Sequence, residues 1–198
     1  MPFAATLVLT IITLIAYTLM NAERTAFMYV QVSAAALVTA ILPIISTITK
    51  KKFPPIINVM IMIHVFLASN LGSAMGFYDK FECWDLVMHG YFGFVAALTL
   101  YLLLLRWNGD KLNRFGFFAM IFLGTLGGAA IWEMFEYTCD TLLGSDAQRV
   151  QESLLLGLSP VKDTMTDIIV AVVGVLVFLA GLYIVNFSKR KATKRFFS

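Results

Sequence analysis

Six blocks of apolar residues, each about 20 residues long, dominate the sequence. A helix needs about 20 apolar residues to cross a bilayer, because each residue adds about 1.5 Å across a hydrocarbon core roughly 30 Å thick. Only 14% of the residues are charged, against about 25% in soluble domains. The chain is therefore predicted to be all-α: a single polytopic transmembrane helical bundle with spans at residues 3–20, 26–49, 55–77, 86–105, 115–138 and 164–187.

Lysine and arginine are divided unevenly between the two sets of alternate connections. Eleven lie in the set formed by residues 50–52, 106–114 and the basic tail 189–198, and four lie in the other set. Cytoplasmic loops are the basic ones, so both termini and the tail are expected in the cytoplasm, with a bacterial cytoplasmic membrane as the location. The net charge of the whole chain is only +3, and its basic residues lie in short clusters between the apolar blocks. The predicted partner is therefore the lipid bilayer, with no role for nucleic acid.

The acidic residues form a second, independent pattern. Eleven of the twelve, all except Asp110, fall on or near the expected outer side. Three spans bring ionisable residues to a similar depth there: the start of the fourth, the end of the fifth and the start of the sixth. The candidate site residues at these positions are Asp85, His89, Glu133, Glu136, Asp163 and Asp167.

The motif WEMFEYTCD, residues 132–140, is the least easily explained part of this pattern. Its acids Glu133, Glu136 and Asp140 lie within about 60° of one another on a helix. They repel each other and oppose the negative end of the helix dipole. Asp85 and Asp163, in contrast, stand at helix N-termini, where a carboxylate can cap free N–H groups. The trio is therefore expected to have a function other than capping.

Carboxylates gathered around one imidazole suit three kinds of work. They bind divalent cations: oxygen ligands favour magnesium, calcium or manganese, and an added imidazole admits zinc or iron. They can also exchange protons as general acid and base, or attract a cationic solute. The predicted cofactor is accordingly a divalent metal ion, with a ligand set of Asp85, His89, Glu133, Glu136 and Asp167.

Three functions follow from these properties and remain open at the level of sequence. The first is a metal-dependent membrane enzyme acting on a lipid-linked or envelope substrate. The second is a cation- or proton-coupled transporter, which needs a polar path across the membrane, or a cation-binding membrane protein. The third is a structural or assembly partner in which the acids only seat the bundle.

Several other residues carry structural expectations. His64 and Asn70 are expected to form interhelical hydrogen bonds, and Gly124, Gly127, Gly128, Gly174 and Gly181 to allow close helix packing. Residues 141–161 should form either a short helix on the membrane surface or a lid over the bundle. For Cys83 and Cys139 two alternatives are open: a disulfide between the fourth and fifth spans, or two unpaired thiols.

The segments GFYDKFECWDLVMHGYFGF, IWEMFEYTCD and VKDTMTDIIVAVVG resemble those of the small YjdF-like membrane proteins of bacteria. The similarity covers residues 72–180 and implies the six-span fold. The resemblance implies the same site residues, because the positions that match the family's motif include Asp85, His89, Glu133, Glu136, Asp163 and Asp167. The motif also matches Tyr78, Trp84, Trp132, Thr164 and Gly174. A looser similarity links the chain to VanZ-like proteins, whose arginine-containing signature is not evident here. The YjdF-like family has no assigned activity, so the resemblance implies no substrate.

Overall fold

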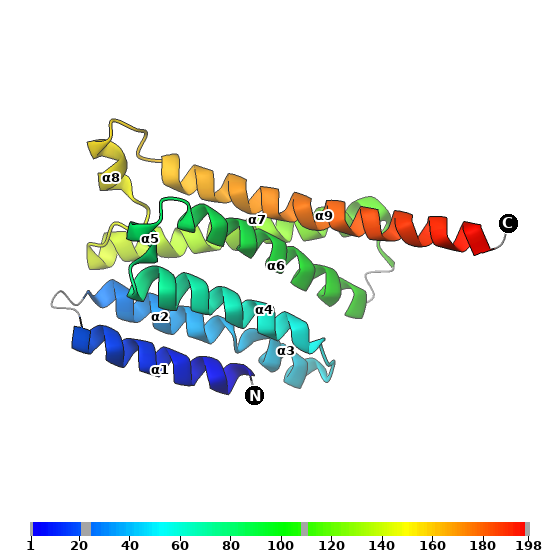
Figure 1. The fold of residues 1–198 in the computed structure, drawn as a ribbon, viewed down its shortest axis with the longest axis horizontal. Helices are drawn as coiled ribbons and strands as arrows, with labels where there is room; N and C mark the ends of the chain where they lie inside the picture. The colour runs from blue at the N-terminus through cyan, green and yellow to red at the C-terminus, as the bar shows by residue number, and fades with distance from the viewer. Residues whose placement is uncertain (1, 21–24, 108–110, 197–198) are drawn as a thin grey trace.

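The computed structural model describes residues 2–20, 25–107 and 111–196, and in these residues it is helical with no β-strand (Figure 1). The elements in chain order are α1 (Pro2–Met20), α2 (Ala26–Val38), α3 (Ile41–Thr49), α4 (Pro55–Val65), the π-helix η1 (Phe66–Ala74), α5 (Phe77–Lys80), α6 (Trp84–Arg106), α7 (Arg114–Leu143), α8 (Val150–Leu155) and α9 (Lys162–Phe196).

Five helical stretches in the described chain are long and apolar enough to cross a membrane, which confirms the predicted polytopic helical fold. The expected first span forms α1, but its described apolar part, Leu7–Leu19, is shorter than the other five. It packs beside α2, α4 and η1. Asn70 of η1 donates a hydrogen bond to Thr13 of α1, which confirms the interhelical bond expected for Asn70. The span-length stretches are Ala26–Thr49, Pro55–Ala74, Trp84–Arg106, Arg114–Leu143 and Lys162–Val185.

Two of the expected spans are not regular α-helices. The second is broken between α2 and α3, where Pro43 cannot donate to the carbonyl of Thr39 and its ring crowds that turn. The third changes at Phe66 from α-helix to π-helix. Such π-helical segments are frequent at functional sites, and η1 buries Ser69, Asn70 and Gly72 in the bundle.

Helices α6 and α9 touch backbone to backbone through small residues. A Cβ atom on Gly93 would lie 2.0 Å from the carbonyl oxygen of Ala171, and one on Gly174 would lie 2.2 Å from that of Gly90. Neither position tolerates a side chain without separating the helices. The close packing predicted for Gly174 is thus confirmed. No such packing was predicted for its α6 partners, Gly90 and Gly93.

Helix α7 packs against α6 through two of its three glycines predicted for close packing, Gly124 and Gly128. A Cβ atom on Gly124 would lie 2.9 Å from Leu100, and one on Gly128 would lie 3.2 Å from Phe92. The prediction is wrong for the third, Gly127, and for Gly181 of α9, where an added Cβ atom would meet none of the described residues within 4 Å. An apolar core also joins α6, α7 and α9. Its fully buried members are Ala97, Ile121, Val175 and Phe178.

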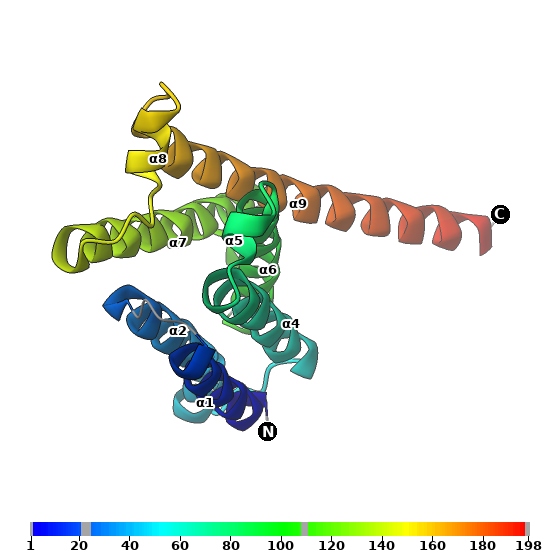
Figure 2. The ribbon, with the colours of Figure 1, turned by 60° about the vertical axis from the view of Figure 1, so that its left-hand side comes forward.

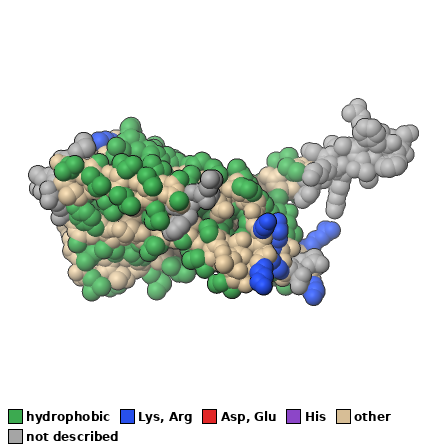
Figure 3. All heavy atoms as spheres, turned by 90° about the horizontal axis from the view of Figure 1, so that it is seen from below, with side chains coloured by type: hydrophobic (Ala, Val, Ile, Leu, Met, Phe, Trp, Pro, Cys, Tyr) green, Lys and Arg blue, Asp and Glu red, His purple; other side chains and the backbone are tan. Residues whose placement is uncertain are grey.

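The two ends of the bundle differ in character. Helices α5 and α8, the first turns of α6 and α9 and the last turns of α7 gather at one end, called the site end below (Figure 1). Figure 2 shows α6 lying between α9 and the group formed by α1, α2 and α4. At the opposite end Lys51 donates a hydrogen bond to the carbonyl of Arg106, so two of the basic connections meet. Figure 3 shows lysine and arginine gathered mainly toward that end, beside a long apolar face.

Candidate functional site

Three candidate residues from two helices meet at the site end. The Nε2 atom of His89 lies 3.4 Å from Oδ1 of Asp85, one turn earlier on α6, and 3.7 Å from Oδ2 of Asp167 on α9. One ligand atom from each of the three residues lies within 4.8 Å of the other two. The side chains of His89 and Asp167 are 11% and 2% exposed. This arrangement is a compact set of two carboxylates and one imidazole.

The glycine contacts between α6 and α9 explain why these residues meet. Asp167 lies seven residues before Gly174, about two turns along the same face of α9. Gly174 packs on the backbone of Gly90, the residue that follows His89. The absence of side chains at this crossing therefore brings Asp167 within reach of His89.

Helix α7 contributes two further buried carboxylates. Glu133 is 5% exposed, and Gln148 donates from Nε2 to its Oε2 atom at 3.4 Å and to its backbone carbonyl at 3.3 Å. The other oxygen, Oε1, is buried and has no hydrogen-bond partner. Glu136 is 8% exposed, and its Oε1 accepts a bond from Nε1 of Trp132 at 2.8 Å. Both glutamates thus retain acceptor capacity away from water.

The charge of this region is not balanced by lysine or arginine. Within the described chain, His89 is the one residue that forms ion pairs with these carboxylates, while the arginine ion pair, Arg149 to Glu152 at 2.8 Å, involves none of them. Burying uncompensated carboxylates is costly. These carboxylates are therefore tolerated either when protons neutralise them or when a bound cation offsets their charge. The carboxylates concerned are Asp85, Glu133, Glu136 and Asp167.

Two acids of the sequence pattern lie outside this group. Asp140 accepts hydrogen bonds from the Ser145 hydroxyl at 2.6 Å, the Ala147 N–H at 2.7 Å and the Gln148 N–H at 3.0 Å. It therefore shapes the connection after α7, and only two acids of the WEMFEYTCD motif remain without such a role. Asp163 is half-buried in the first turn of α9, one turn before Asp167.

The connection between α7 and α9 folds over the site end. Besides Glu133, the Nε2 atom of Gln148 contacts the Thr164 hydroxyl on α9 at 3.0 Å. Of the two alternatives for residues 141–161, this contact matches a segment folded over the bundle, while Leu154 and Leu155 of α8 remain exposed. Gln148 had no sequence signal, since a glutamine in a polar loop belongs to no pattern.

Tyr78 of α5 packs tightly beside the site. A Cβ atom on Gly72 would lie 2.4 Å from Cε2 of its ring, so the glycine in η1 makes room for it. Burial, and then the carboxylates of Asp85, Glu136 and Asp167, raise the pKa of the Tyr78 phenol well above its ordinary value of 10.0. The hydroxyl therefore stays neutral at physiological pH and keeps a proton to donate.

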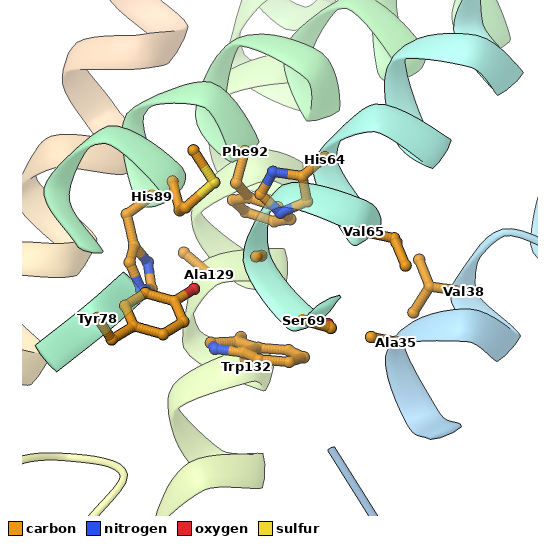
Figure 4. Close-up of a pocket in the computed structure, with 12 residues that line it drawn as sticks. Ala35, Val38, His64, Val65, Ser69, Tyr78, His89, Phe92, Ala129 and Trp132 are labelled. Carbon is orange, nitrogen blue, oxygen red and sulfur yellow. The ribbon is translucent and has the colours of Figure 1, made fainter. Parts of the chain in front are cut away.

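Two cavities adjoin at Tyr78. One, of about 110 Å³, is mainly apolar and reaches from His89 and Tyr78 to His64 (Figure 4). Figure 4 draws Ala35 and Val38 of α2 on the side of this cavity opposite to His89. The other cavity, of about 200 Å³, is more polar and contains Tyr78, Asp85 and Glu136 in its wall.

Two remaining expectations concern His64 and the cysteines. The Nδ1 atom of His64 is buried without a hydrogen-bond partner, and the ring packs 5.5 Å from that of Tyr91 and 6.1 Å from that of Phe92. The hydrogen bond expected for His64 is thus not formed at Nδ1. Cys83 is exposed and Cys139 buried, and both are free thiols, so of the two alternatives the unpaired one holds.

The fold and this site define a polytopic α-helical membrane protein with a buried cluster of carboxylates and one histidine at one end. The chain belongs to the family described as "Predicted membrane protein (DUF2238)", whose model matches residues 3–187. This membership confirms the resemblance to the YjdF-like proteins.

An uncharacterized protein of Thermotoga maritima is 31% identical over 155 residues, which cover 76% of this chain and 70% of that protein. No solved structure matches the chain. The comparisons therefore establish a membrane-protein family of unknown function and supply no substrate.

Proposed function

We propose that this protein is a membrane-embedded enzyme that binds one divalent cation through Asp85, His89 and Asp167 and hydrolyses a lipid-linked substrate. The observation that carries the proposal is the convergence of three ligand atoms, one imidazole nitrogen and two carboxylate oxygens, within 4.8 Å in a largely buried site. Water activation by such a cation is the chemistry it supplies.

The distances from His89 to the two aspartates come close to those around a small first-row cation, and the third pair of ligand atoms, from Asp85 and Asp167, lies within 4.8 Å. Two ligands at 2.0–2.2 Å from a tetrahedrally coordinated ion stand about 3.3–3.6 Å apart. The Nε2 atom of His89 lies 3.4 Å and 3.7 Å from its two aspartate oxygens. One imidazole with two carboxylates suits zinc, manganese or iron better than calcium, which prefers six to eight oxygens.

Glu133 is the proposed general base. Its Oε1 atom is buried and unpartnered, and its other oxygen is held by Gln148. A carboxylate fixed in this way can accept a proton from an attacking water. Glu136, whose Oε1 accepts a bond from Trp132, was also among the five predicted metal ligands. Among the described residues, the ligand atoms that converge are those of Asp85, His89 and Asp167.

A one-sided enzyme site accords with the packing better than a transport path. The apolar core of Ala97, Ile121, Val175 and Phe178 fills the space between α6, α7 and α9 beyond the site. A cation path along these helices would have to cross it without polar ligands. The basic connections at the opposite end favour a site that faces away from the cytoplasm.

The test combines metal content with lipid chemistry. Protein purified without chelator should contain about one divalent ion per chain, Glu133→Gln should retain it, and Asp167→Asn should lose it. Glu82→Gln, an exposed acid at the same end, is the matched control and should match the wild type. Incubation with a bacterial lipid extract, followed by mass spectrometry, should show a product only with metal-loaded wild type and Glu82→Gln. Metal-free wild type, or an unchanged lipid profile, would refute the proposal.

A further inference from the structure

The two adjoining cavities point to one occupant, and we infer that it is a phospholipid with a primary ammonium headgroup, one of its acyl chains entering the apolar cavity and its head in the polar one. This inference rests on the proposed function, because it names the substrate class of that site. It is argued from the walls of the cavities and from the residue they share.

The wall of the apolar cavity includes one residue that is exposed on the surface of the bundle. Ala35, Val65 and Met88 in its wall are buried, whereas Val38 in the same wall is 42% exposed. An exposed valine on a span-length helix faces lipid. The cavity therefore has a lateral mouth beside α2, through which an acyl chain can enter without leaving the hydrocarbon.

The polar cavity carries charges of both signs, with acids in excess. Its charged lining residues are Asp79, Asp85, Glu136, Asp146 and Arg149. Asp146 accepts hydrogen bonds from the N–H groups of Gln151 and Glu152 at the start of α8. The other three carboxylates complement a cationic group, and the guanidinium complements a phosphate. The ion pair of Arg149 with Glu152 uses the Nε atom. A zwitterionic head with an ammonium and a phosphate matches this distribution of charge.

A buried, unsatisfied glutamine gives independent evidence that the polar cavity holds a ligand. Gln31 of α2 lines it, is 6% exposed, and has an Oε1 atom without any hydrogen-bond partner. Leaving such a group unpaired costs about 1–3 kcal/mol. An amide oxygen accepts from N–H donors, which a primary ammonium carries and a quaternary ammonium lacks.

Tyr78 joins the two cavities because it lines both. Its neutral phenol can donate to a phosphate or ester oxygen at the junction between head and chain. His89 lines the apolar cavity and Asp85 the polar one. The junction of the lipid would therefore lie beside the proposed metal ligands, where a hydrolytic reaction needs it.

The test measures lipid binding on chelator-treated protein, so that it does not depend on the metal. Native mass spectrometry and thermal unfolding are recorded with dioleoyl phosphatidylethanolamine, phosphatidylcholine and phosphatidylglycerol. Phosphatidylethanolamine should bind at least tenfold more tightly than the other two. Equal binding of all three would overturn the inference and leave only an annular lipid contact.

Matched variants locate the binding. Gln31→Leu and Ala35→Phe should each weaken phosphatidylethanolamine binding at least tenfold, while Gln151→Leu and Ala26→Phe, at exposed positions, should bind like the wild type. If Ala35→Phe does not fold, Ala68→Leu replaces it in the test, because it adds a smaller side chain to the wall of the same cavity. Wild-type affinity in the folded cavity variants would refute the inference.

A further variant separates this inference from the proposed function. Asp167→Asn, which lines neither cavity, should lose the metal and keep the lipid. Lipid retained by a wild type that binds no metal refutes the proposed function alone. Metal retained without lipid selectivity refutes the lipid assignment alone.

Discussion

His89 on α6 and Asp167 on α9 face each other with Nε2 and Oδ2 3.7 Å apart, and this contact is the centre of the site. It depends on the glycine crossing between the two helices. In Asp167→Asn the side chain keeps its shape and loses its charge. We expect zinc or manganese at 100 times its dissociation constant to stabilise the wild type by about 2.7 kcal/mol and the variant not at all, as read from unfolding with and without metal. Glu82→Gln should respond like the wild type; an equal response in Asp167→Asn would contradict the assignment.

Gln148 should matter for holding the covering segment in place. Gln148→Leu removes the donor to Glu133 and to Thr164, and leaves buried acceptors unpaired at a cost of about 1–3 kcal/mol. We expect a lower melting temperature and faster proteolytic cleavage between residues 144 and 149. Gln151→Leu, on the exposed side of α8, should change neither. Cleavage of Gln148→Leu at the wild-type rate would show that the segment is held by other contacts.

The glycine crossing gives a prediction with an internal control. Gly93→Ala places a methyl group 2.0 Å from the Ala171 carbonyl oxygen, so α6 and α9 must separate, at a cost of about 1–3 kcal/mol. Metal binding should fall with it, because His89 and Asp167 move apart. Gly127→Ala meets nothing within 4 Å and should melt at or above the wild-type temperature. Equal melting temperatures for the two variants would mean that the crossing is looser than described.

Tyr78 gives a pH dependence whose sign is fixed. Its pKa is raised in the folded protein by burial and by the carboxylates of Asp85, Glu136 and Asp167. The stability that comes from the neutral phenol is therefore complete below about pH 10, the unfolded value, and is lost as the pH rises above it. Between pH 9 and 11 the wild type should lose more stability than Tyr78→Phe, by at most about 1.4 kcal/mol at pH 11. Tyr137→Phe, exposed on α7, should follow the wild type.

Much of the fold was predictable because span length and hydrophobicity are local properties. The breaks within spans were less so: Pro43 lies in an apolar run, and the π-helix at Phe66–Ala74 has no simple sequence pattern. Boundaries shifted where a glycine ended a helix, as at Gly144, whose φ of 67° ends α7 beyond the predicted residue 138.

The part of the candidate site that lies on a single helix face was predictable from the spacing of its residues. Asp85 and His89, four residues apart, do meet. The contact with Asp167 depends on how closely α6 and α9 approach, which is a tertiary property. Asp140 looked equivalent to Glu133 on a helical projection, yet its acceptors are used by the connection after α7. The burial of Gln31 and the long-range contacts of Gln148 are tertiary properties that no sequence pattern indicates.

The most direct test of the metal site uses the two histidines of the chain. Chelator-treated, tag-free protein is titrated with manganese and with zinc, and the bound ion is counted for the wild type, His89→Ala and His64→Ala. We predict about one ion per chain for the wild type and for His64→Ala, and none for His89→Ala. No bound ion in the wild type, or the same stoichiometry in His89→Ala, would contradict the account.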